Sequence, residues 1–184
     1  MMKYLWVLVL MLSSLYADRD GGPYIAIGYG SSQFDDDGLY TSLKNDKTGA
    51  ASVAFGAYIN KHLSVEFNYT DMSAFNTSNG IEVDDTTNLK LFALDFSTLA
   101  HYAFFDDLWD FYAKFGVGEM HQDNSEIKGF SFVYGVGTSI RFNEVMSLKF
   151  ALDRFDFGYD ANGDNSQDYA FKIDYIYTAL EFQF

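Results

Sequence analysis

The chain contains no cysteine, a single proline (Pro23), and no apolar run after residue 17 long enough to cross a bilayer as a helix. Without cysteine, the fold has no disulfide and the exported N-terminus has no thiol for lipid attachment. A transmembrane helix needs about 20 apolar residues. If the chain enters a membrane it must therefore do so as a closed β-sheet, because lipid offers no hydrogen-bond partner to an open strand edge.

Basic residues are also scarce. Lys and Arg number 12 against 26 Asp and Glu, a formal net charge of −14. Because phosphate binding needs clustered Lys and Arg, the composition excludes nucleic acid as a partner. Aromatic residues, in contrast, make up 19% of the chain, and there are 15 glycines. Abundant aromatics with little proline favour strands over helices.

The N-terminus has the order typical of a secretory signal peptide. Lys3 is followed by an apolar run over residues 5–12 and by a small-residue exit that ends at Ala17. The run is too short to span a bilayer, so a cleaved leader is the better interpretation. We expect residues 1–17 to be removed and residues 18–184 to form one domain.

From Pro23 onward, bulky apolar residues alternate with small or polar ones at a period of two, which predicts strands. Residues 63–70 show this most clearly, with Leu63, Val65 and Phe67 on one face and Ser64, Glu66 and Asn68 on the other. The pattern divides the chain into eight segments, near residues 23–32, 50–60, 63–70, 89–104, 109–120, 130–142, 146–153 and 170–184. It predicts an all-β fold, an eight-stranded antiparallel up-and-down transmembrane β-barrel.

Side-chain size decides which face of this barrel meets lipid. A soluble barrel would place its bulky residues inside and would need a roomy interior. Here the opposite face carries glycines that suit a cramped interior, so we expect the bulky face to point into hydrocarbon. These glycines are Gly28, Gly30, Gly56, Gly116, Gly118, Gly135 and Gly137.

The connections alternate in length. Short ones lie near residues 60–62, 106–107 and 143–144, and long ones near 33–48, 71–88, 121–128 and 157–169. Outer-membrane barrels have short periplasmic turns and long extracellular loops. The alternation therefore predicts that both ends of the barrel domain lie on the periplasmic side.

With leader, strands and loops in this order, the chain resembles the OmpA/OmpX-type family of small outer-membrane barrels over nearly all of its mature length. Leu180, Phe182 and Phe184 share one face, as in the C-terminal aromatic signal of that family. The resemblance implies insertion by the barrel assembly machinery, contact with lipid and lipopolysaccharide, and a monomer in the outer membrane of a Gram-negative bacterium. It covers only the barrel, so the peptidoglycan anchoring of OmpA is not expected.

Seven ionisable residues are expected to point into the lumen: Glu66, Asp95, Lys114, Arg141, Lys149, Asp153 and Glu181. Near-balance of the two signs favours a plug of salt bridges, because unpaired buried charge is costly. The alternative is a gated ion path, which the narrow bore of eight strands disfavours. Counting back from Phe184 places Tyr175 and Tyr177 inside and Asp174 outside, so we expect a bulge or a rim position at Asp174.

The long connections carry most of the negative charge. They would repel lipopolysaccharide phosphates unless Ca²⁺ or Mg²⁺ bridged the two; no other cofactor is expected. Asp160, Asn162, Asp164 and Asp168 have spacings like the start of a calcium loop. That loop lacks the glycine at its sixth position, and Phe171 stands where a closing Glu belongs, so solvated turn residues are the alternative.

The three histidines are the candidate catalytic residues of the chain. His62 and Ser64 have base-and-nucleophile spacing, His101 is expected to face the lumen, and His121 lies beside Asp123 and Ser125 at the start of a long loop. No motif supports these residues, so we expect a non-enzymatic barrel. Its expected role is to support membrane integrity and to display acidic loops for interaction or adhesion. A narrow porin-like channel is the second hypothesis and a lipid-modifying barrel enzyme, acting on lipopolysaccharide, the third.

Overall fold

The structure is a computed structural model that describes residues 21–35, 42–45, 47–78, 87–105, 107–122, 128–159 and 169–184. The predicted leader, residues 1–17, lies outside the described residues. The strands are β1 (Gly22–Asp35), β2 (Ser42–Asn45), β3 (Lys47–Asn60), β4 (Leu63–Ser78), β5 (Thr87–Phe104), β6 (Trp109–Gln122), β7 (Lys128–Arg141), β8 (Met146–Tyr159) and β9 (Tyr169–Gln183). In the part of the chain that is described, no helix has the length and apolarity to cross a membrane.

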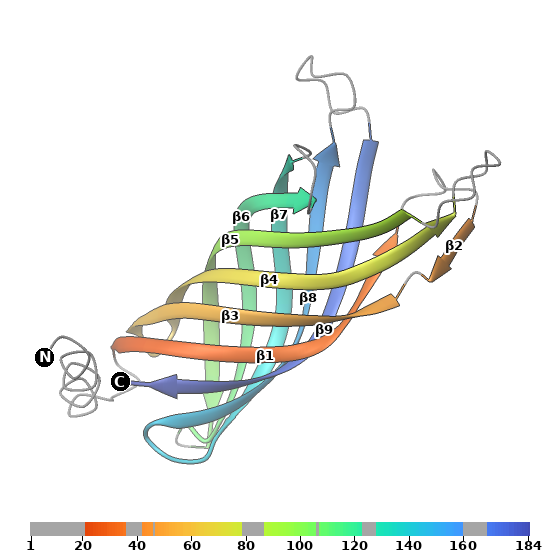
Figure 1. The fold of residues 1–184 in the computed structure, drawn as a ribbon. Helices are drawn as coiled ribbons and strands as arrows, with labels where there is room; N and C mark the ends of the chain where they lie inside the picture. Colours follow the sequence, from red (N-terminus) through yellow and green to blue (C-terminus); the bar gives the residue numbers. More distant parts are fainter. Residues whose placement is uncertain are drawn as a thin grey trace, which may run out of the picture.

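Eight of these strands close into an antiparallel barrel. β1 pairs with β3 on one side and with β9 on the other. Each strand from β3 to β8 pairs with the next strand in the chain, and the β4–β5 pairing completes the ring. Figure 1 shows the barrel tilted, with β1 and β9 side by side. The predicted eight-stranded up-and-down barrel is confirmed.

The strands are longer than predicted at one end. β4 continues to Ser78 and β5 begins at Thr87, within the connection expected over residues 71–88. The short strand β2, inside the connection expected over 33–48, pairs with the far end of β4 (Figure 1). We call this end of the barrel the loop end, and the opposite one the turn end.

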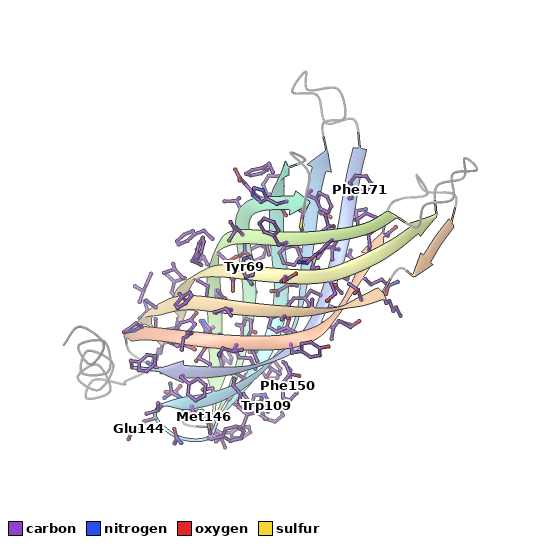
Figure 2. The ribbon with its side chains drawn as sticks, in the orientation of Figure 1. Tyr69, Trp109, Glu144, Met146, Phe150 and Phe171 are labelled. Atoms are coloured by element: carbon purple, nitrogen blue, oxygen red, sulfur yellow. The ribbon has the colours of Figure 1, made fainter. Side chains whose placement is uncertain are left out.

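The turn end has three short connections. Asn60 Oδ1 accepts a hydrogen bond from the His62 backbone N, and Asn143 Oδ1 accepts one from Met146 N. Such Asx turns reverse the chain within a few residues. Figure 2 shows Trp109, Glu144 and Met146 near this end and Phe171 near the other.

Bulky side chains face outward along the barrel wall. Phe55, Phe96, Phe115 and Val136 each expose more than half of their surface, at 58%, 54%, 65% and 60%. Their strand neighbours on the opposite face are buried or are glycines. The predicted orientation, large apolar side chains outside and small or polar ones inside, holds for the part of the wall nearer the turn end.

At the loop end this pattern reverses. The inward residues there are large and apolar, and include Met72, Phe155 and Ile173, which are at most 1% exposed. Their outward neighbours are charged, as with Asp71 beside Met72 and Arg154 beside Phe155. The expectation that small and ionised residues fill the whole interior is therefore wrong for this end. The physical reason is that the wall leaves hydrocarbon here, so polar groups face out to water and apolar groups pack inside.

Strand β9 is regular along its length. Its pairing with β8 and β1 runs without a register shift, so the bulge considered at Asp174 is not formed. Asp174 instead faces outward and accepts two hydrogen bonds from Arg154 of β8. Leu180, Phe182 and Phe184 share the outward face, and Phe184 N donates to Pro23 O at 2.9 Å.

Candidate functional site

Tyrosine rings narrow the lumen by folding over glycines of the neighbouring strand. Tyr24 is paired with Gly56, and Tyr112 with Gly137. A Cβ at either glycine would come within 2.3 Å of the facing ring. Glycine at these positions therefore lets an aromatic ring lie flat against the barrel wall, and the ring fills the bore.

Two lysines organise the middle of the lumen. Lys149 Nζ lies 2.9 Å from Glu66 Oε1 and 2.6 Å from Glu181 Oε2. Lys114 Nζ lies 2.9 Å from Asp153 Oδ2, 3.9 Å from Glu66 Oε2 and 4.0 Å from Asp95 Oδ1. These six residues, which we call the ion network, are at most 4% exposed. Glu66 joins its two halves because it contacts both ammonium groups.

Carboxylates outnumber ammonium groups in the ion network, and neutral donors compensate for part of the difference. Tyr24 donates to Glu66 at 2.8 Å, Tyr58 to Glu181 at 3.0 Å, and Tyr177 to Asp153 at 3.1 Å. Asp95 accepts hydrogen bonds from Asn68 and Ser97. A count of charged residues in the sequence does not include these neutral donors. The position of each tyrosine on the inward face of its strand is the sequence signal that could have identified them.

Arg141, the seventh predicted lumen residue, stands apart from the ion network. It lies near the turn end and donates through Nη2 to Gln183 Oε1 at 3.0 Å. The structure thus brings six of the seven predicted residues together. A cavity beside Glu66, Asn68 and Lys149 has a volume of about 10 Å³, which is room for at most one water molecule.

A second closure lies above the ion network at the loop end. Phe34, Phe157 and Phe171 pack with ring centroids 5.4 to 6.5 Å apart. They belong to one buried cluster with nine further residues, which we call the apolar plug: Ala50, Met72, Leu91, Ala93, Met120, Val133, Phe155, Ile173 and Tyr175. An ion entering from the loop end would have to shed its water to cross this plug, which is costly.

The histidines occupy three different environments. His62 is exposed in a turn, whereas Ser64 faces the lumen, so the spacing of the two does not bring them together. His121 lies outside the barrel, stacked on Phe92 at 4.9 Å and 3.1 Å from Glu119 Oε2. Its sequence neighbours Asp123 and Ser125 lie outside the described residues. His101 faces the lumen, as predicted, and bonds Ser64 and Asp110.

The predicted cation ligands, which lie outside the described residues, are Asp160, Asn162, Asp164 and Asp168. Among the residues that are described, no group of three or more His, Asp or Glu could hold a metal ion.

A closed antiparallel barrel with an apolar wall and a polar, side-chain-filled lumen defines a small integral β-barrel of the outer-membrane class. The chain belongs to the family of outer membrane protein β-barrel domains, whose model matches residues 5–178. It is an outer-membrane protein of a Gram-negative bacterium.

Solved barrels share this fold at low sequence identity. Neisserial surface protein A is 14% identical, with a TM-score of 0.56, over 89% of this chain and 97% of its own. OprG from Pseudomonas aeruginosa is 12% identical, with a TM-score of 0.56, over 91% and 98%. Ail of Yersinia pestis, solved with the heparin analogue sucrose octasulfate, is 14% identical, with a TM-score of 0.53, over 90% and 99%. No curated protein matches the chain.

Proposed function

We propose that this protein is a non-conducting surface barrel that supports outer-membrane integrity and displays acidic loops to partners outside the cell. The observation that carries the proposal is closure of the lumen at two levels, by the ion network and by the apolar plug. Either closure alone would hinder an ion path. Together they leave the loops and the outer wall as the surfaces with which the protein acts.

Conductance in planar lipid bilayers tests this proposal. We expect the folded protein to give no steady channels. The double variant Phe155→Ala with Ile173→Ala removes side-chain volume from the apolar plug. It should also stay closed, because the ion network still fills the lumen below the cavity that these substitutions create. Large, steady single-channel currents from the unaltered protein would refute the proposal and favour the porin-like alternative.

The loop partners of this barrel are proposed from its charge. The structure of Ail holds sucrose octasulfate, a polyanion. This chain has a net charge of −14, much of it in the long connections, so repulsion disfavours a polyanionic partner. We propose that divalent cations link its loops to lipopolysaccharide and that cationic surfaces are its protein partners. Insertion as a monomer by the barrel assembly machinery belongs to the same proposal.

Binding of the folded protein to lipopolysaccharide in nanodiscs tests the cation link. We expect Mg²⁺ to raise the affinity and chelation by EDTA to lower it. Affinity that does not respond to either would contradict a metal bridge.

A further inference from the structure

Three polar side chains at the turn end form a hydrogen-bonded chain, which Tyr24 links to Glu66 of the ion network. Ser64 lies near the start of β4, Asp110 near the start of β6, and His101 on β5 between them. The Ser64 Oγ is 2.8 Å from His101 Nε2, and His101 Nδ1 is 2.7 Å from Asp110 Oδ2. Barrel closure thus joins residues that are 37 and 9 positions apart in the sequence.

The hydrogen bonds fix the roles of the two imidazole nitrogens. An ionised Asp110 can only accept, so the proton of a neutral His101 is on Nδ1 and its Nε2 accepts from the Ser64 hydroxyl. Tyr58 and Tyr112 pack on the imidazole with ring centroids at 5.3 and 5.6 Å. The ring is therefore held in the orientation in which histidine serves as a general base for serine.

We propose that Ser64 is an activated nucleophile that transfers acyl groups from small esters entering at the periplasmic mouth. Ser64 Oγ attacks the ester carbonyl carbon while His101 Nε2 takes the hydroxyl proton. The C–O bond to the alcohol then breaks, and His101 returns the proton to the leaving oxygen. Water, deprotonated by His101, cleaves the Ser64 ester and releases the carboxylic acid.

Two neighbours border the site. The Tyr24 hydroxyl lies 3.3 Å from Ser64 Oγ but donates its proton to Glu66 at 2.8 Å, so it stabilises an oxyanion at Ser64 only by releasing Glu66. Asp110 acts through His101 and is a positioning residue. The exposed fractions of Ser64 and Asp110 are 0% and 1%, and Ser64 directly follows the first residue of β4. This burial excludes bulky lipids and macromolecules, so the proposed substrates are the smallest acyl esters, which have to displace the side chains that cover Ser64.

The inference goes beyond the proposed function, which rests on closure of the lumen and on the charge of the loops and does not depend on reactivity of Ser64. Its direct test is the reaction of the folded, detergent-purified protein with diisopropyl fluorophosphate, read by intact mass and peptide mapping. We expect one adduct, with an O–P bond formed at Ser64 and fluoride released. Ser64→Ala should give none, and His101→Gln and Asp110→Asn should slow labelling about 100-fold.

Ser97 supplies the matched control, because it is a buried serine whose hydroxyl donates to Asp95 and not to a histidine. Ser97→Ala should label like the unaltered protein. A heat-dependent shift in gel mobility shows in each variant that the barrel is folded. Absence of an adduct on the folded barrel, or equal labelling of the folded His101→Gln variant, would overturn the proposal.

Discussion

The buried charged groups of the lumen are compensated by a small number of partners that several groups share. Glu66 contacts Lys149 directly and Lys114 more loosely, and it accepts from Tyr24 as well. Removing one member of a buried ion pair leaves the other charge without compensation, and this costs more than the pair itself contributes. Glu66 is therefore the residue on which the ion network depends most.

Glu66→Gln should lower the free energy of unfolding by about 3 kcal/mol, because Lys149 and Lys114 lose a shared counter-charge in a nearly dry interior. Urea titration of the barrel in lipid vesicles measures this loss. Glu119→Gln is the control, since that side chain is 59% exposed and should change stability by less than about 1 kcal/mol. Equal effects of the two variants would contradict the network.

Gly137→Val should also destabilise the barrel, because its Cβ would come within 2.3 Å of the Tyr112 ring, which is buried. We expect a loss of about 2 kcal/mol in the same assay. The double variant Gly137→Val with Tyr112→Ala should recover part of it. No recovery would mean that the clash lies with the backbone and not with the ring.

At the scale of elements, each strand carries two patterns in succession. On β8, Phe150 and Leu152 face outward below Arg154, whereas Phe155 and Phe157 face inward above it. The period of two continues through this point while the apolar face changes sides. For this reason strands predicted from a single apolar face end too early, at the point where that face becomes charged.

Two isoleucines of β9 test whether the apolar face of the strand changes from the outside to the inside of the barrel. Ile173 is buried in the apolar plug with 0% exposure, and Ile176 is 61% exposed on the outer wall. Ile173→Ala should cost about 3 kcal/mol, because it leaves a cavity. Ile176→Ala should cost less than about 1 kcal/mol, because lipid chains fill the space. Unfolding in vesicles compares them, and equal losses would contradict the assignment.

At the scale of the whole molecule, the architecture was predictable and the interior was only partly so. Alternation, loop lengths and the terminal Phe184 were enough for an eight-stranded outer-membrane barrel. Lumen contacts such as Ser64 with His101 were not, because register between strands decides which inward residues meet. The sequence placed Ser64 with His62, two residues away, whereas the barrel places it with His101 of the next strand.

The absence of native cysteine allows the orientation of the wall to be measured directly. Nitroxide labels on Phe150→Cys, Leu152→Cys and Asp156→Cys in lipid vesicles would report collisions with oxygen, which partitions into hydrocarbon, and with a water-soluble nickel chelate. We predict that collisions with oxygen dominate at positions 150 and 152 and that collisions with the nickel chelate dominate at position 156. Nickel dominating at 150 and 152 would contradict it, because the bulky face would then lie in water.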